Sequence, residues 1–490
     1  MDDRTAASSS LTRRASTRAR PFNHTGIPMA AEPLNEMPLP TETPNANRSF
    51  GEPSNVEGPP RESHVERPPT DGRRCRVVSV NPFLLGYPFR PGSGGRNKAV
   101  YQLHGGLSVR DDIDLIWYPI GDPKHHEPLA TRHPETGGQF TLWNIAMPRG
   151  GGVVGRVTQG VRECVAMATG RRPLGNLLTD PAVDIVHVHH SHPAPPWMRD
   201  ARHRRAGNAT RLLSHHSGGL SNQLRHYDHV VFVSEHQRRL AIQGGYPADR
   251  TSVIYYPCDP AFLSDELEDG PEDGPKDEPK NGPRNAGSPT DRSRIIYVGN
   301  LIRRKNPDRV VSAVNRLDDC PADVVGSGEL DAASRRQDVG GRCTFHGRRS
   351  AEQVATLMRH AAACVMPSVS EGLALGYIEA VCSGVPIIGY PPNVSEIAER
   401  LGCEVGYAFD AEREDDDALA ELIRSVRDPA GPWADPERRR RLRDRARRHF
   451  SLERFVDSYA ALYRRLSGST PSARRDEDAT PAGEPRRAAA

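Results

Sequence analysis

The stretch PSVSEGLALGYIEAVCSGVP, residues 367–386, decides the fold class that we expect for this chain. An apolar run ends just before it at Met366 and predicts a buried strand, and the apolar spacing from Leu375 onward predicts a helix. Gly384 and Pro386 are residues that typically follow a helix end. Strand, loop and helix therefore follow one another in the order typical of a parallel α/β domain.

The loop and the start of this helix form a candidate anion site. The first N–H groups of a helix have no partner within it and carry the positive end of its dipole, which favours a diphosphate. Gly372 lets the backbone approach a ligand closely. Glu371 is placed to reach a sugar, and Glu379 lies about one turn into the helix, where a carboxylate accepts hydrogen bonds from two ribose hydroxyls. By themselves, two glutamates eight residues apart are more often a loop acid and a solvated helix acid.

The whole run outweighs that simpler interpretation because it resembles the signature of family 4 glycosyltransferases. In that family Glu, Gly, an aromatic residue, Gly and Leu are followed by a second Glu, an Ala and Gly-x-Pro. The sequence has Leu373 and Ala374 where an aromatic residue and a glycine are usual, and it keeps Glu371, Gly372, Leu375, Glu379, Ala380, Gly384 and Pro386. The resemblance covers roughly residues 75–466. It implies that Glu371 holds the transferred sugar, that Glu379 holds the ribose, and that Gly372 and Leu375 line the donor site.

A second loop, VGNLIRRKNP at residues 298–307, resembles the family's diphosphate loop. Lys305 lies six residues after Gly299, where the family has the lysine of an Arg/Lys pair that neutralises the leaving diphosphate. Asn300 stands at the usual arginine position, so Arg303 or its neighbour Arg304 is the candidate for the missing charge. Lys305 is also the only lysine after the linker in a chain with five. The alternative for Lys305 is an exposed loop lysine.

Three further matches are weaker. Gly94 and Gly95 resemble the family's Gly-Gly loop, which faces the donor phosphates and the acceptor; by itself this pair reads as a tight turn. His216 ends a predicted strand where the family has a histidine near the reacting sugar, and His215 is the alternative after a one-residue slip. Arg348 follows Phe345-His346-Gly347 and resembles a contact to the nucleotide base.

Four histidines, at 187, 189, 190 and 192, give the impression of a metal cluster. On a strand, residues 187 and 189 share one face while residue 190 points away. The family commonly ends this strand with one or two histidines and needs no metal. We therefore expect no metal site and no cofactor, with a nucleotide sugar as co-substrate.

Alternating strand and helix patterns predict α/β domains with parallel sheets. The resemblance implies the GT-B architecture, two Rossmann-like domains facing each other across a cleft. The expected organisation in chain order is a disordered tail at 1–72, an N-terminal Rossmann-like acceptor domain at 73–262, an acidic Gly/Pro-rich linker at 263–293, a C-terminal Rossmann-like nucleotide-sugar domain at 294–448, a helix at 449–467 that returns to the N-terminal domain, and a disordered tail at 468–490.

Composition excludes several classes of protein. The 66 Lys+Arg and 63 Asp+Glu residues give a formal net charge of only +3, which argues against a nucleic-acid partner. The arginine run at 438–448 is offset by acids, so a peripheral membrane contact is the less favoured interpretation and a solvated helix face the preferred one. The eight cysteines are scattered singly and no apolar run approaches the ~18 residues of a membrane span. These features predict a cytoplasmic protein.

The expected function is a retaining hexosyltransferase that moves a sugar from a UDP- or GDP-sugar to an unknown acceptor hydroxyl. The resemblance implies a same-face displacement assisted by the donor phosphate, with His216, Glu371 and Lys305 as the catalytic group. The alternative is a catalytically weak or inactive relative that binds nucleotide or a protein partner. Asn300 and the long tails motivate that alternative.

Overall fold

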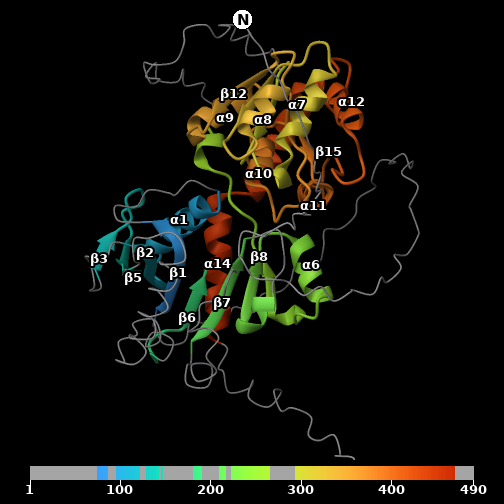
Figure 1. Cartoon of the computed structure of the whole chain (residues 1–490). Helices are drawn as coiled ribbons and strands as arrows, with labels where there is room; N and C mark the ends of the chain where they lie inside the picture. Colours follow the sequence, from blue (N-terminus) through green and yellow to red (C-terminus); the bar gives the residue numbers. More distant parts are fainter. Residues whose placement is uncertain are drawn as a thin grey trace, which may run out of the picture. The chain divides into compact units, whose positions relative to one another are not determined.

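The computed structural model describes residues 74–85, 95–121, 129–142, 145–146, 180–189, 209–216, 222–264 and 293–468 (Figure 1). All of them belong to one compact unit, Pro69–Ala490. The predicted tail at 1–72 lies outside the described residues, as do the predicted tail at 468–490 except for Gly468 and most of the predicted linker. Element labels follow Figure 1.

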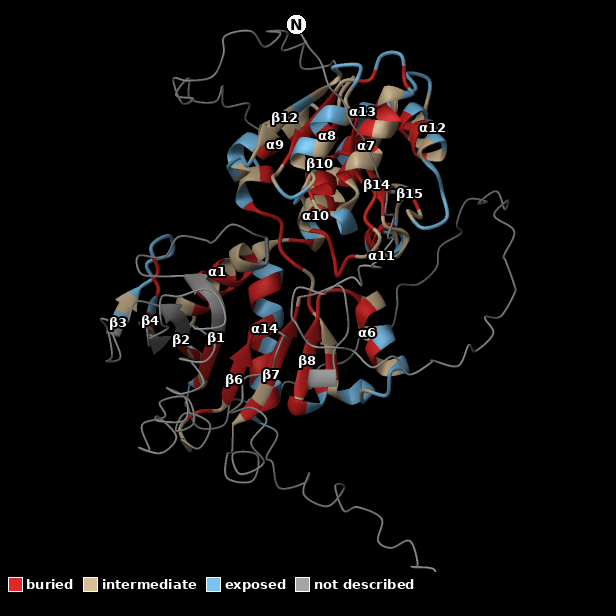
Figure 2. Ribbon diagram, in the orientation of Figure 1, coloured by how far each residue is buried: buried red, intermediate tan, exposed pale blue. Residues whose placement is uncertain are grey.

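The first sheet has the strand order β3-β4-β2-β1-β6-β7-β8-β9, with β5 paired to β2. All its pairings are parallel except that of β3 with β4. The strands are β1 (Cys75–Leu85), β2 (Ile113–Gly121), β3 (Leu129–Arg132), β4 (Gln139–Leu142), β5 (Ile145–Ala146), β6 (Ile185–Val188), β7 (Thr210–His215), β8 (His229–Phe232) and β9 (Thr251–Val253). Figure 2 shows β6, β7 and β8 almost entirely buried, as expected of parallel strands covered on both faces.

Two parts of the first sheet differ from the sequence-based expectation. In the sequence, the dipeptide Asn81-Pro82 favours the end of the strand that starts at Cys75, but β1 continues to Leu85. The pairing with β2 shifts register between Asn81 and Leu85, and such an irregularity accommodates a residue that cannot donate to the ladder. Strands β3, β4 and β5 were not predicted, because their short runs lack a sustained alternation.

The second sheet is entirely parallel, in the order β12-β11-β10-β13-β14-β15. Its strands are β10 (Ile295–Val298), β11 (Ala322–Val325), β12 (Cys343–Gly347), β13 (Ala363–Met366), β14 (Ile387–Gly389) and β15 (Gly406–Ala408). The strand order reverses direction between β10 and β13, which makes this pair the topological switch point of a Rossmann-like sheet. The predicted fold class, two Rossmann-like α/β domains, is confirmed.

Helices connect the strands of both sheets. The first sheet carries α1 (Gly95–Ser108) and α6 (Glu235–Gln243) among its described residues. The second sheet carries α7 (Pro307–Asn315), α8 (Asp331–Gln337), α9 (Ala351–Arg359), α10 (Leu375–Cys382), α11 (Pro391–Leu401) and α12 (Asp416–Arg427). No described helix combines the length and the apolar character that crossing a membrane requires.

The chain ends with α13 (Pro436–His449) and α14 (Leu452–Ser467). Helix α14 packs against α1, β1 and β6 of the first sheet (Figure 1). Tyr463 Oη lies 2.7 Å from His187 Nδ1, and Tyr459 Oη lies 2.7 Å from Ser214 Oγ. These buried contacts make the last helix part of the first domain's core.

Helix α13 is not simply a solvated face, as its arginine run suggested. Arg439 is only 6% exposed and donates to the carbonyl oxygens of Trp433 and Ala362. Arg447 donates to the carbonyl oxygen of Cys382 at the end of α10. Several of the remaining arginines pair with acids on or beside the helix, among them Arg440 with Glu437. Much of this run therefore holds the fold together.

Candidate functional site

Two loops meet at the switch point of the second sheet. One follows β10 and spans residues 299–306; the other follows β13 and spans residues 367–374. Asn306 Nδ2 donates to the Pro367 carbonyl oxygen at 2.9 Å, and the Val369 N–H donates to the Arg304 carbonyl oxygen at 2.9 Å. Asn306 has a φ of 47°, a left-handed conformation that asparagine tolerates better than most residues. The two predicted donor loops are thus joined into one surface.

Glu371, Lys305 and Arg304 form an ion cluster where these loops meet. Lys305 Nζ lies 2.7 Å from Glu371 Oε1, and Arg304 Nη1 lies 3.2 Å from Glu371 Oε2. Glu371 is only 7% exposed, and burial by itself raises the pKa of its carboxyl group. Lys305 and then Arg304 outweigh that effect, so the pKa of Glu371 lies below its ordinary value. The Lys305 side chain is 15% exposed, so the interpretation of this residue as an exposed loop lysine is wrong.

The loop that carries Glu371 is held by Asn393 of α11. Asn393 is fully buried; its Oδ1 accepts from the Ala374 N–H and its Nδ2 donates to the Gly372 carbonyl oxygen, both at 3.2 Å. A Cβ on Gly372 would lie 3.0 Å from Gln237 Nε2, which is tighter than most real contacts. Ala374 is the N-cap of α10 and offers no side chain to the helix's first N–H groups, so they stay available near Leu375.

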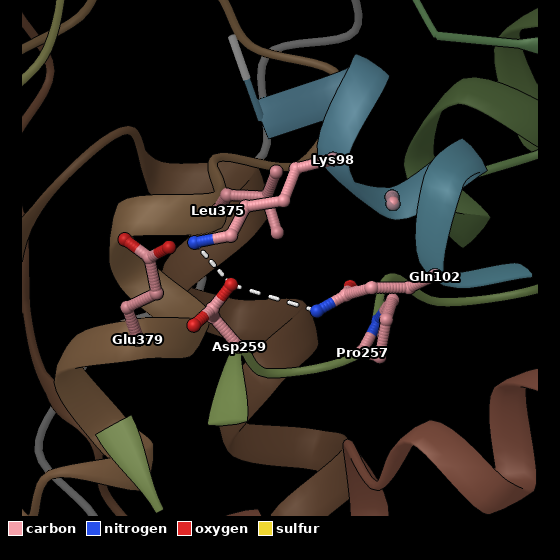
Figure 3. A pocket seen from close by; sticks show the side chains of 7 residues that line it. Lys98, Gln102, Pro257, Asp259, Leu375 and Glu379 are labelled. Carbon is pink, nitrogen blue, oxygen red and sulfur yellow. Dashed lines mark hydrogen bonds and ion pairs between the residues drawn. The ribbon is translucent and has the colours of Figure 1, made fainter. Parts of the chain in front are cut away.

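Glu379 lines a small pocket of about 10 Å³, together with Leu375 and with residues of the first domain and its closing segment (Figure 3). Those residues are Lys98, Ala99, Gln102, Pro257 and Asp259. Burial raises the pKa of the Glu379 carboxyl group to about 7, and the charge of Lys98 works against that rise. Lys98 forms an ion pair with Asp259, and Gln102 Nε2 lies 3.5 Å from Asp259 Oδ2.

The other predicted donor residues lie at the same edge without joining the cluster. Arg303 is exposed, and its backbone N–H lies 3.5 Å from Glu329 Oε1; Arg304 rather than Arg303 reaches Glu371. Arg348 follows β12, and its Nε donates to Ser327 Oγ at 2.8 Å.

His216 follows the end of β7 in the first sheet. Its Nδ1 lies 2.6 Å from Tyr256 Oη, and the two rings are stacked with 5.7 Å between centroids. His215 is fully buried against Phe232, so His216 is the histidine at the edge of the sheet. Gly95 begins α1, and Gly94 lies outside the described residues.

The histidines of β6 belong to a buried hydrogen-bonded network. His187 Nε2 lies 2.7 Å from Ser214 Oγ, and the centroid of its ring lies 3.8 Å from that of His189 with the rings tilted by 44°, as the shared strand face predicts. Burial lowers the pKa of His187 well below its ordinary value, so the ring is neutral. His190 and His192 lie outside the described residues, and within the part that is described no group of side chains fits a metal ion.

Sequence reasoning missed Lys98, Asp259, Asn393 and Glu396. The scarcity of lysine was a usable signal for Lys98, but it was applied only to Lys305. The sequence pattern around Glu396 favours a helix that begins at this residue, whereas α11 begins at Pro391 and Glu396 lies buried within it. Its Oε1 and Oε2 accept from the N–H groups of Glu235 and His236, at 2.5 and 3.0 Å, so this carboxylate caps the first turn of α6.

Comparison with known proteins agrees with this geometry. The family described as Glycosyltransferase Family 4 matches residues 93–262, and the family described as Glycosyl transferases group 1 matches residues 280–449; together they cover more than half of the chain. A protein from Mycobacterium tuberculosis named D-inositol 3-phosphate glycosyltransferase is 29% identical over 202 residues. That match spans 37% of this chain and 39% of the relative.

Solved structures share the fold over most of the chain. Sucrose-phosphate synthase from Thermosynechococcus elongatus superposes with a TM-score of 0.57 at 20% identity, covering 80% of this chain and 99% of that one. Anabaena HepE, solved in complex with UDP-glucose, superposes with a TM-score of 0.52 at 14% identity, covering 79% of this chain and 98% of that one. At these identities the likeness establishes the GT-B fold.

Proposed function

The chain belongs to glycosyltransferase family 4, and on that premise we propose that it transfers a hexosyl unit from a nucleoside diphosphate sugar to an acceptor hydroxyl, with retention of configuration. The observation that carries the proposal is the cluster of Glu371, Lys305 and Arg304 at the switch point, where parallel sheets bind ligands. UDP-sugars are the first donors to test, because the HepE structure in the comparison contains UDP-glucose. GDP-sugars are the second.

In the proposed donor complex, Lys305 and Arg304 face the diphosphate and Glu371 accepts hydrogen bonds from hydroxyls of the transferred sugar. Cations placed where negative charge develops on the leaving group stabilise the transition state, and they do so most strongly where water is excluded. The ion cluster supports this assignment because it holds both signs of charge in place before the ligand arrives. Arg304 supplies the second positive charge in a loop that has Asn300 at the family's arginine position.

The transfer step proceeds on one face of the sugar. The acceptor oxygen forms a bond to the anomeric carbon, the bond from that carbon to the diphosphate oxygen breaks, and the acceptor proton passes to the departing diphosphate oxygen. The role proposed for His216 is to contact the reacting sugar, with Tyr256 Oη fixing the orientation of its ring at 2.6 Å. In this arrangement Glu379 accepts hydrogen bonds from the two ribose hydroxyls of the donor.

The test is nucleotide release from a panel of UDP- and GDP-sugars, with and without candidate acceptors. We expect one donor to be hydrolysed slowly by the wild-type protein, and Glu371→Gln to reduce that release at least tenfold. Glu399→Gln changes an exposed acid on α11 and serves as the matched control, with release unchanged.

The second candidate function is a relative that binds nucleotide without turnover, which Asn300 at the family's arginine position favours. Under that alternative, nucleotide sugars raise the melting temperature of the protein but none is cleaved. Glu371→Gln then changes affinity only, and that outcome would replace the transferase proposal.

A further inference from the structure

Lys98 brings a positive charge from the first domain into the pocket that holds Glu379. It lies on α1, in the first turn after the glycine loop, and Figure 3 shows its ammonium group pointing between the carboxylates of Asp259 and Glu379. Asp259 is 7% exposed, pairs with Lys98, and accepts from the Ala261 N–H through Oδ1 at 3.0 Å. Nothing in the proposed transfer step yet uses Lys98 or Asp259.

We propose that Lys98 is a positioning residue for donor binding: anchored by Asp259, its ammonium group keeps the Glu379 carboxylate ionised so that it accepts the hydroxyls of the donor ribose. This inference rests on the proposed function, because it takes Glu379 as the hydroxyl acceptor. It adds a residue from the opposite domain to that subsite.

Among the charged groups that the structure describes around Glu379, Lys98 is the one that favours its ionised form. Asp259 faces Glu379 from the closing segment of the first domain and forms the ion pair with Lys98. Cys258 lies on the same segment, and a hydrogen bond with Cys382 together with burial raises the pKa of its thiol. Burial raises the pKa of Cys364 on β13, so both thiols are neutral near pH 7. Within the described residues, Lys98 is the cation that lowers the pKa of Glu379.

The ion pair with Asp259 holds Lys98 in place when a ligand enters the pocket. Burial lowers the pKa of Lys98, and Glu379 is the first of the acids that oppose this change. The pocket measures only about 10 Å³, against the roughly 300–1,000 Å³ of typical ligand pockets. A nucleoside must therefore displace side chains here, and the buried Asp259 retains the ammonium group while Glu379 turns towards the ribose.

The ionisation of Glu379 sets the sign of the pH effect. Its pKa of about 7 means that the carboxylate is protonated as the pH falls through 7, so donor affinity should fall there. Lys98 is the charge that lowers the pKa of Glu379, and removing such an opposite charge raises a carboxyl pKa by about 1 unit. At pH 7 the ionised fraction would then fall from about one half to about one tenth, a roughly fivefold loss of affinity.

The experiment measures binding of UDP-glucose to the full-length protein between pH 5.5 and 9 by calorimetry, with GDP-mannose as the second probe. These diphosphate diesters carry no phosphate proton that titrates near pH 7. For Lys98→Met we expect the midpoint of affinity to move up by about 1 pH unit, with recovery towards wild-type affinity at pH 9. Lys98→Arg should keep the wild-type midpoint.

Gln102→Met is the matched control. Gln102 lies one turn further along α1 and contacts the same Asp259, but it carries no charge, so its substitution should leave the midpoint unchanged. A Lys98→Met variant with the wild-type midpoint, or with the same loss at every pH, overturns the inference. If the wild-type protein binds neither probe at any pH, the proposed function fails and this inference fails with it.

Discussion

Asn393→Ala tests whether α11 holds the loop that carries Glu371. The asparagine is fully buried and makes two hydrogen bonds to backbone groups, at Ala374 N–H and the Gly372 carbonyl oxygen. Truncation leaves one buried donor and one buried acceptor unsatisfied, at about 1–3 kcal/mol each. Because the loop can relax towards solvent, we expect about 2 kcal/mol, which corresponds to roughly thirtyfold in the equilibrium for local opening.

Hydrogen exchange is the suitable assay, because a two-domain protein does not give a single unfolding free energy. The peptide that covers residues 371–376 should exchange about thirtyfold faster in Asn393→Ala, while peptides in β11 and β12 keep their rates. Ser395→Ala changes an exposed residue on the same helix and serves as the control. Exchange within about twofold of the wild-type rate in residues 371–376 would refute the idea that Asn393 secures this loop.

Two further substitutions test the ion contacts. Lys305→Arg should lower nucleotide release at least tenfold. A compact ammonium group can contact Glu371 and phosphate oxygens from several directions, and a planar guanidinium cannot. Turnover at the wild-type rate would show that a positive charge alone suffices. Glu396→Gln should weaken the cap on α6 by about 1 kcal/mol, since a neutral amide binds the Glu235 and His236 N–H groups less strongly. Faster hydrogen exchange in the first turn of α6 of Glu396→Gln, but not of Glu399→Gln, would support this role of Glu396. Equal exchange rates in the two variants would contradict it.

The sequence predicted the regular part of the fold because parallel, buried strands are readable as short apolar runs. The sequence pattern predicts a helix at 235–243, and α6 has those bounds; the helix predicted at 375–383 ends one residue earlier in α10, at Cys382. The prediction was poorest between residues 119 and 180. Strands β3, β4 and β5 lie there, and their two to four residues are too short to establish a period.

At the candidate site, residue types and loops were predictable but their partners were not. The lysine spacing from Gly299 singled out Lys305, and the structure adds that its ammonium group contacts Glu371. Arg303 and Arg304 are adjacent and equally basic, so only the turn between β10 and α7 decides which one faces the carboxylate. The sequence also could not separate His215 from His216. In the structure, His215 ends β7 and is buried, whereas His216 is the first residue after the strand.

By itself, the sequence determined the succession of strand, loop and helix and the family to which the chain belongs, because these depend on local periodicity and on motifs of fewer than 25 residues. The tertiary structure alone decided which charges meet. Glu371 lies 66 residues beyond Lys305, and Lys98 is separated from Glu379 by most of the described chain. Parallel strands bring such distant residues to one sheet edge, and the electrostatic environment of a carboxylate is created only by that convergence.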